Sequence, residues 1–340
     1  MPSGVARSFT DPDAYARFVP STKVQLTVAK RGQFKAKVTL VALRDLWMQR
    51  FSDNLPRVAH SAAESGRVVI SFRTAPGPSL IWGGLEMTPE TLLRHNEAFD
   101  SFQRSSGSAA WGSVSLPVAT MANIGSMMAD RELTAPRDPV SVAPSLLAMS
   151  RLHRIHTAIG RLAASEPELL AHAGAAKGME QALIGAMVSC LTGSESHQTS
   201  RAQGRHHALM RKFHALLEAN PEEPIYMPEL SVAFGVSGRT LRNCFQEHLG
   251  MGLKRYLLLR RLHLARHALM EGAPGKVTVT DTATRYGFWE LGRFAGAYKS
   301  VFGESPSATL RGGDDELYVS NKARGDKSVS LRALTWTDAM

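Results

Sequence analysis

The sequence predicts an α+β protein of two domains, in which a β-barrel or β-sandwich followed by helices precedes an all-α domain. Apolar and polar residues alternate through much of residues 24–116, which is typical of half-buried strands. From about residue 143 apolar residues recur at helical spacing instead, and residues 205–310 carry one helical pattern twice. At 340 residues the chain is long enough to form two separate cores.

The first predicted domain spans residues 1–192, with its strands in the part up to about residue 120. Residues 24–28 alternate between apolar and polar, and residues 34–40 do so again after the turn candidate Arg31-Gly32. We expect these two segments to pair as a half-buried hairpin. Further short strands, separated by Gly, Pro and Ser, are expected at residues 68–72, 80–82, 99–103 and 111–116.

Two apolar helices close the first domain, at about residues 146–164 and 175–191. Together they carry more apolar surface than one small sheet needs. Either this surface packs within its own domain, or residues 143–192 form the interface of a homodimer, since exposed helical stripes usually meet a partner.

The second half of the chain divides into three parts by composition. Residues 193–204 are polar without periodicity, which predicts a linker. Residues 205–311 are the predicted all-α domain. Residues 312–340 begin with Gly-Gly-Asp-Asp-Glu and predict a polar tail with little regular structure.

The repeated pattern in the all-α domain predicts two helix-turn-helix units. Each copy is a short helical stretch with an Ala, then a Gly, an apolar residue and a longer helical stretch; the three residues are Ala233, Gly235 and Val236, then Ala283, Gly287 and Phe288. Gly supplies the left-handed backbone of a tight turn, and Ala allows close helix packing. In this motif the second helix enters the major groove of DNA.

The second helix of the first unit separates into an apolar and a polar face. We expect Ser237 to cap it, and its buried stripe to be Leu241, Cys244, Phe245 and Leu249. This arrangement turns Arg239, Arg242, Asn243 and Gln246 outward. Arg pairs with guanine and Asn with adenine, so the first three are candidates for reading base edges. The alternative is an ordinary solvated helix face.

A long helix at residues 252–271 separates the two units. Its length of about 30 Å approaches the pitch of B-DNA, about 34 Å, so it could hold two reading heads on one side of the duplex. Its basic residues are assigned to phosphates or solvent rather than to bases: Lys254, Arg255, Arg260, Arg261 and Arg266.

Residues 205–311 resemble the DNA-binding domain of the AraC/XylS family of bacterial transcription regulators. The resemblance rests on the motifs at residues 237–241, 258–266 and above all 283–288 (Ala-Thr-Arg-Tyr-Gly-Phe), and on the closing Phe-Gly-Glu-Ser-Pro-Ser at 302–307. It implies that outward residues of both second helices read bases. In the second unit these positions are Leu291, Gly292, Arg293 and Gly296.

The second unit departs from the expected pattern. Only Arg293 offers a strong base contact there, so this unit is expected to respond to shape or phosphates more than to sequence. We expect Glu290 to cap its second helix, with acceptance of a hydrogen bond from cytosine as the alternative. Contacts with the DNA backbone are expected from Ser237, Thr240, Gln246, Lys254, Arg255 and Lys299.

The first domain resembles the cupin-like sensing domains of the same family in layout, although not in motif. The resemblance implies a small-molecule effector or a purely dimerising role. Candidate pocket residues are Phe34, Trp47, Phe72, Trp82 and Trp111, with plain core packing as the alternative. His60 stands alone among the strands and His95 lies near a turn, so no metal and no cofactor are expected.

Charge and cysteine content favour a non-enzymatic DNA binder. The formal net charge of +10 favours an anionic partner such as double-stranded DNA. RNA polymerase is a further partner if the chain is an activator. No secretory signal or membrane span is expected, which predicts a cytoplasmic protein. The alternatives are an architectural DNA binder and a repair-type protein that transfers alkyl groups to a cysteine, although Cys190 and Cys244 both lie in apolar contexts.

Overall fold

The computed structural model describes residues 2–19, 22–63, 66–96, 100–129, 133–136, 138–192, 195–197, 201–221, 225–272 and 277–312. Residues 1–26 with 33–211 make up one compact unit, and residues 27–32 with those from 212 onward make up a second. The predicted tail lies outside the described residues from 313 onward. None of the helices in the described part is long and apolar enough to cross a membrane.

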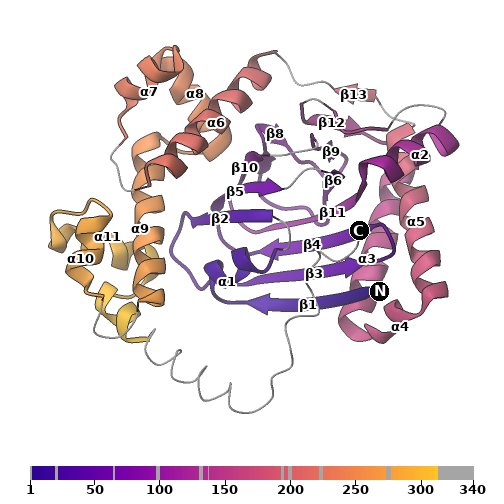
Figure 1. Ribbon diagram of the computed structural model, residues 1–340, viewed down its shortest axis with the longest axis horizontal. Coiled ribbons are helices and arrows are strands. Elements are labelled where there is room, and N and C mark those ends of the chain that lie inside the picture. The colour runs from indigo at the N-terminus through magenta and orange to yellow at the C-terminus, as the bar shows by residue number, and fades with distance from the viewer. Residues whose placement is uncertain are drawn as a thin grey trace. The chain divides into compact units, whose positions relative to one another are not determined.

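The first unit contains a larger and a smaller antiparallel sheet (Figure 1). In spatial order the larger sheet consists of β1 (Ser3–Phe9), β3 (Ala36–Ala42), β4 (Trp47–Asp53), β11 (Ala109–Pro117), β6 (Arg67–Arg73), β9 (Leu92–Arg94), β12 (Val140–Ala143) and β13 (Glu195–His197). The smaller sheet consists of β2 (Thr22–Val28), β5 (Arg57–Ala63), β10 (Asp100–Ser105), β7 (Leu80–Trp82) and β8 (Leu85–Glu86). These sheets confirm the predicted β-rich first half.

The predicted hairpin of residues 24–28 with 34–40 is wrong. Both segments are strands, but β2 belongs to the smaller sheet and β3 pairs with β1 and β4 in the larger one. The alternation of apolar residues shows which face of a strand is buried and leaves its pairing partner open. Strand β1 itself was not predicted.

Helices cover one face of the larger sheet. They are α2 (Val118–Ala129), α3 (Leu146–Ser165), α4 (Glu168–Ala171) and α5 (Ala173–Thr192). The short helix α1 (Pro12–Arg17) contacts β1 and β3, and its Tyr15 lines a cavity on the other side of the sheet. Helices α3 and α5 lie side by side in Figure 1, and α3 contacts β1 and β3. This confirms the two predicted apolar helices, whose buried residues such as Leu152, Ile159, Leu183 and Met187 share one core with the sheet. Most of their apolar surface is therefore used within the domain.

The two faces of the larger sheet differ because side chains alternate along each strand. On β11, Val114 and Leu116 belong to the core beneath the helices, whereas Trp111, Ser113 and Ser115 line a cavity on the other side. The same alternation runs along β4 and β6. One face of the sheet thus builds the core, and the other builds the wall of an interior cavity.

The linker predicted at residues 193–204 contains regular structure. Strand β13 pairs with β12 through Ser141 and His197, and helix α6 (Arg201–Ala219) begins four residues before the predicted domain start. The polar composition of this stretch does not indicate either element. A three-residue edge strand such as β13 needs no alternation of apolar residues, and the first residues of α6 are mostly polar.

From residue 212 onward the described part of the second unit is all-α, as predicted. Its helices are α7 (Met227–Phe234), α8 (Gly238–Leu249), α9 (Leu253–Glu271), α10 (Val279–Arg285) and α11 (Leu291–Phe302), together with the C-terminal part of α6. Helices α7 and α8 contact each other, as do α10 and α11, and α9 contacts both α8 and α10 (Figure 1). The long helix therefore connects two helical pairs.

Candidate nucleic-acid interface and interior cavity

The first helix-turn-helix unit is built by a glycine turn and a serine cap. Gly235 ends α7 with a left-handed φ of +64°, and the N–H of Val236 donates to the carbonyl of Ser231 at 3.1 Å. This is the Schellman pattern, which favours glycine because an L side chain strains that backbone. Ser237 then caps α8, its Oγ accepting from the N–H of Thr240 at 3.2 Å. The predicted cap is confirmed.

Helix α8 has the two predicted faces. Leu241, Cys244, Phe245 and Leu249 are buried, and Phe245 packs against Phe213 of α6 with ring centroids 4.9 Å apart. On the opposite side lie four exposed polar side chains: Arg239, Arg242, Asn243 and Gln246. Thr240 is half-buried, and its hydroxyl lies 3.0 Å from that of Ser237. The buried face fixes the rotation of α8, so the polar face is presented outward.

The second unit repeats the turn with a different cap. Thr278 caps α10, its Oγ1 accepting from the N–H of Asp281 at 3.0 Å. Gly287 follows with a φ of +74°, and the N–H of Phe288 donates to the carbonyl of Ala283 at 2.9 Å. Helix α11 then begins after Glu290. The turn predicted from the repeat is confirmed in both units.

The expected capping role of Glu290 is wrong. Its side chain makes no capping hydrogen bond and instead accepts from Arg293 Nη1 at 2.9 Å. Both side chains are exposed, at 64% and 82%, and such exposed pairs contribute little to stability. Arg293 is therefore held to Glu290 only by a weak, exposed ion pair.

The outward face of α11 carries few polar groups. Besides Arg293 and Lys299, it presents Leu291, Gly292 and Gly296, all exposed. Trp289, directly before the helix, is 79% exposed; the sequence analysis did not single it out. Its position in the sequence could have drawn attention to it. Trp289 lies just before the second helix of the second unit, outside the pattern of apolar residues that are buried on that helix.

Helix α9 is both scaffold and partial surface. Its 19 residues span about 28 Å. Lys254 and Arg255 near its start are exposed, as their predicted phosphate role requires. Arg260 contradicts the expectation of a phosphate or solvent role, because it is only 6% exposed and donates to the carbonyl of Leu217 at 3.3 Å.

Two further arginines of α9 also face the protein. Arg261 is half-buried, with its guanidinium 5.1 Å from the ring centroid of Phe288, and burial lowers its pKa from the ordinary value. Arg266 lies 3.7 Å from the carboxylate of Glu304. The spacing of residues along the helix does not distinguish these arginines from exposed ones. An arginine side chain is long enough to place its charged end in solvent or against the protein from the same position beside the apolar stripe.

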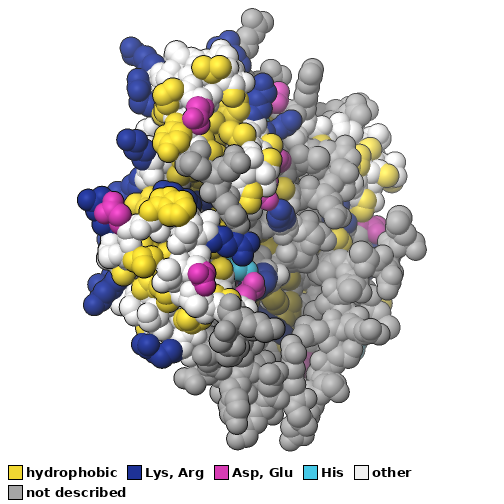
Figure 2. Space-filling model, turned by 60° about the vertical axis from the view of Figure 1, so that its left-hand side comes forward, with side chains coloured by type: hydrophobic (Ala, Val, Ile, Leu, Met, Phe, Trp, Pro, Cys, Tyr) yellow, Lys and Arg dark blue, Asp and Glu magenta, His cyan; other side chains and the backbone are white. Residues whose placement is uncertain are grey.

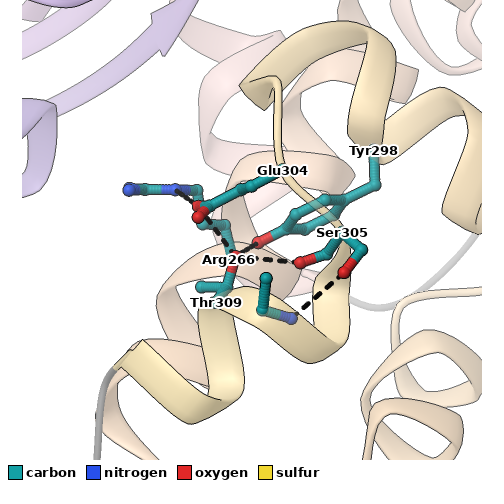
Figure 3. A network of polar contacts seen from close by, with 6 residues as sticks. Arg266, Tyr298, Glu304, Ser305 and Thr309 are labelled. Carbon is teal, nitrogen blue, oxygen red and sulfur yellow. Dashed lines mark hydrogen bonds and ion pairs between the residues drawn. The ribbon is translucent and has the colours of Figure 1, made fainter. Parts of the chain in front are cut away.

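A polar network closes the end of the second unit (Figure 3). The buried Tyr298 hydroxyl donates to Thr309 Oγ1 at 2.8 Å, and that hydroxyl donates to Glu304 at 2.8 Å. Ser305 caps the final helical turn by accepting from the N–H of Ala308 at 3.2 Å. The closing motif of residues 302–307 is thus a structural clasp that joins α9, α11 and the last turn.

Basic side chains gather on the surface of the second unit. In Figure 2 dark blue Lys and Arg side chains line one edge of the described surface, with apolar and uncharged side chains beside them. Such a surface attracts a polyanion through counterion release. The described residues contain no group of three or more His, Cys, Asp or Glu side chains that could hold a metal ion.

The interior cavity lies in the first unit between the two sheets and has a volume of about 100 Å³. Three predicted pocket residues line it: Trp47, Trp82 and Trp111. Phe72 is fully buried on the opposite face of β6, where it packs against His156 at 4.9 Å between ring centroids. Phe34 packs against Tyr15 at 5.7 Å, outside the lining. Composition identified the aromatic residues, but a one-residue register decides which face each occupies.

The two cysteines are structural. Cys190 and Cys244 are both fully buried, and neither forms a disulfide in the described part of the chain. Burial raises the pKa of each thiol to about 12, so both remain protonated near neutrality, whereas the nucleophilic form of cysteine is the thiolate.

Comparison with known proteins locates the similarity in the second unit. A family described as a helix-turn-helix domain matches residues 230–312. Over 95 residues the chain is 42% identical to the probable thc operon regulatory protein of Rhodococcus erythropolis and 39% identical to the XylDLEGF operon transcriptional activator of Pseudomonas putida. These alignments cover 28% of this chain but only 29% and 30% of the two relatives, so the chain spans under a third of their length.

One solved structure is also similar to part of this chain. It is described as a probable AraC family transcriptional regulator from Rhodopseudomonas palustris CGA009 and is 35% identical in sequence. The match covers 31% of this chain and 97% of that one, with a TM-score of 0.29.

Proposed function

Because residues 230–312 are a helix-turn-helix domain of the AraC/XylS family, we propose that this chain is a sequence-specific DNA-binding transcription regulator. One observation carries the proposal: α8 buries one face and presents Arg239, Arg242 and Asn243 together on the other. These groups match the hydrogen-bonding edges of guanine and adenine in the major groove. The named role of the Pseudomonas putida relative favours activation over repression.

The proposal assigns some of the basic and polar residues to contacts with DNA bases and the others to contacts with DNA phosphates. Arg239, Arg242 and Asn243 read base edges from α8, and Arg293 does so from α11 once its pair with Glu290 opens. Six residues contact the backbone: Ser237, Thr240, Gln246, Lys254, Arg255 and Lys299. All six are exposed or half-buried, which supports this assignment.

The remaining parts of the chain receive supporting roles in the proposal. Residues 1–192 sense a small-molecule effector and mediate dimerisation, and residues 205–311 bind DNA. The exposure of Leu146 and Leu147, 77% and 82%, supports a homodimer contact at the start of α3. An activator of this kind works with RNA polymerase at the bacterial chromosome, which places it in the cytoplasm.

Two alternatives fit the structure less well. An architectural DNA binder would need no interior cavity, whereas the first unit keeps one lined by three Trp side chains. An alkyl-transfer protein needs an accessible thiolate, and both thiols are buried with raised pKa values. Treating the folded chain with iodoacetamide distinguishes the latter: rapid stoichiometric labelling would revive it.

Binding to duplex DNA selected from a random pool tests the proposal. Affinity should fall steeply with salt, because Lys and Arg displace counterions. Arg239→Ala should cost about 1–3 kcal/mol on the selected duplex and relax specificity at one base pair. The control is Arg211→Ala on α6, an exposed arginine outside the reading face. Equal weakening on every duplex would reassign Arg239 to the backbone, and failure to select any sequence would contradict the proposal.

A further inference from the structure

An arginine is buried in the first unit with most of its hydrogen-bonding capacity unused. Arg57 begins β5 and is 1% exposed. Its Nε donates to Asp53 Oδ2 at 2.9 Å, and its guanidinium carbon lies 4.7 Å from the ring centroid of Trp111. Both Nη atoms lack a hydrogen-bond partner among the described residues. A buried donor without an acceptor costs free energy, so this arrangement points to an occupant.

A second unused donor lies on the same wall of the cavity. Gln103 of β10 is 2% exposed, and its Nε2 also has no partner among the described residues. In the register of the smaller sheet Gln103 faces Ala59, and Ser105 faces Arg57. Gln103 and Arg57 are therefore diagonal neighbours on one face of the sheet, about 7–8 Å apart at the backbone. One ligand group can reach both.

A second arginine makes the cavity electropositive. Arg67 of β6 lies with its guanidinium carbon 3.7 Å from the ring centroid of Trp47, and its Nη2 donates to the carbonyl of Asp45 at 2.7 Å. Burial lowers its pKa to about 10, so it stays charged near neutrality. No Asp or Glu is among the described residues that line the cavity. Asp53 pairs with Arg57 but is not part of the cavity lining. Its single negative charge can offset only one of the two positive charges of Arg57 and Arg67.

Three serine hydroxyl groups of the cavity are already engaged. Ser113 donates to Gln49 at 3.0 Å, Ser71 lies 3.0 Å from His95 Nε2, and Ser115 accepts from Arg67 at 3.1 Å. The buried polar side-chain atoms of the lining that have no hydrogen-bond partner among the described residues are all donors: Arg57 Nη1, Arg57 Nη2 and Gln103 Nε2.

We propose that this cavity binds a small organic acid, whose carboxylate is held by Arg57 and Gln103 under the field of Arg67 and whose apolar body packs against Trp47, Trp82 and Trp111. The inference rests on the proposed function, because it names the chemical class of the effector. A carboxylate satisfies the guanidinium fork with two parallel hydrogen bonds, and a flat apolar body fits the ring-lined walls.

The test uses the full chain and three probes that share one ring: phenylacetate, its neutral amide phenylacetamide, and the cation phenethylamine. Thermal unfolding and isothermal titration are measured with each. The expected result is a rise in unfolding temperature and measurable heat with phenylacetate only. Equal binding of acid and amide would overturn the anion site, and so would binding of none of the probes at millimolar concentration.

Variants locate the site. Arg57→Gln should weaken phenylacetate binding roughly 10- to 100-fold, the value of a charge-assisted pair, and Gln103→Leu should weaken it less. Arg44→Gln, on an exposed loop arginine, should change nothing. If Arg57→Gln fails to fold, the double variant Asp53→Asn with Arg57→Gln removes both buried charges together. Unchanged binding in the folded variant would contradict the proposal.

DNA binding of the same variants separates this inference from the proposed function. If phenylacetate binds through Arg57 but the chain selects no DNA sequence, the carboxylate site stands and the regulatory function fails. If DNA is selected but no probe binds, the reverse holds.

Discussion

The two helix-turn-helix units share their interior and differ on their surface. Both use a left-handed glycine, Gly235 or Gly287, to turn into the second helix, and both bury an aromatic residue on it, Phe245 or Phe294. Outward, α8 presents long polar side chains, whereas α11 presents Leu291, Gly292, Arg293 and Gly296. The fold of the motif is thus repeated while the means of contacting DNA is not.

The glycines of α11 show what the difference means. A Cβ atom added at Gly292 or Gly296 would meet nothing within 4 Å, so packing does not require either glycine. Glycine inside a helix is unfavourable by about 0.5–1 kcal/mol relative to alanine. We infer that the smooth face lets the backbone of α11 approach the phosphates closely, which suits a clamp better than a reader of bases.

The largest expected effect tests the shared interior. Phe245→Ala and Phe294→Ala should each lower the free energy of unfolding by about 3–5 kcal/mol, because each leaves a cavity in a packed core. Urea unfolding of the two variants measures this. A large loss in one unit and almost none in the other would show that the cores are not equivalent.

The next effect tests the difference in reading. Arg239→Ala should cost about 1–3 kcal/mol of DNA binding at its own base pair. Arg293→Ala should cost less, because Arg293 must first leave Glu290, and its loss should be confined to a single base pair. Titration of duplexes substituted one base pair at a time measures both. Arg255→Ala serves as a phosphate control, which should reduce the salt slope by about 1.

A smaller effect tests the two helix starts. Ser237→Ala removes a hydrogen-bonded cap and should lower the free energy of unfolding by about 1 kcal/mol. Glu290→Ala removes a side chain that caps nothing and should lie within about 0.5 kcal/mol of the wild type. Ser237→Asp, which keeps an acceptor at the cap, should restore most of the loss. A large cost at Glu290 would mean that its side chain supports α11 after all.

The smallest effect tests the clamp. Gly292→Ala and Gly296→Ala should each stabilise the free chain by about 0.4–1 kcal/mol, because alanine restricts the unfolded chain more than glycine does. Both should weaken DNA binding evenly across sequences if the backbone approaches DNA closely. Stabilisation with unchanged DNA binding would remove the clamp from the account.

The sequence predicts a structural feature well when neighbouring residues in the chain determine that feature, and poorly when distant residues do. The turns at Gly235 and Gly287 and the Ser237 cap follow from neighbouring residues alone, and the structure confirms them. The pairing of β2 with β5 depends on distant strands, and alternation cannot reveal it. Helix α2 was missed because its stretch, Val118–Ala129, carries no charged residue to give an amphipathic pattern.

Buried charges escaped sequence analysis for a related reason. Arg57 and Arg260 look like surface residues in any pattern, since arginine is usually exposed. Their burial follows from tertiary partners, Asp53 in one case and the carbonyl of Leu217 in the other. The sequence therefore identified the exposed polar face of α8 and three of the aromatic residues that line the cavity, and it missed the buried donor Arg57.

Selection of binding sites from a random duplex pool by the full chain tests the central claim most directly. If α8 reads bases and α11 clamps the backbone, the selected sites should share one short block of fixed base pairs for each bound chain. The segment one helical turn away should be fixed at no more than the one base pair that Arg293 contacts and should otherwise vary freely. Two blocks of equal information, about 10 base pairs apart, would contradict the account and make α11 a second reader.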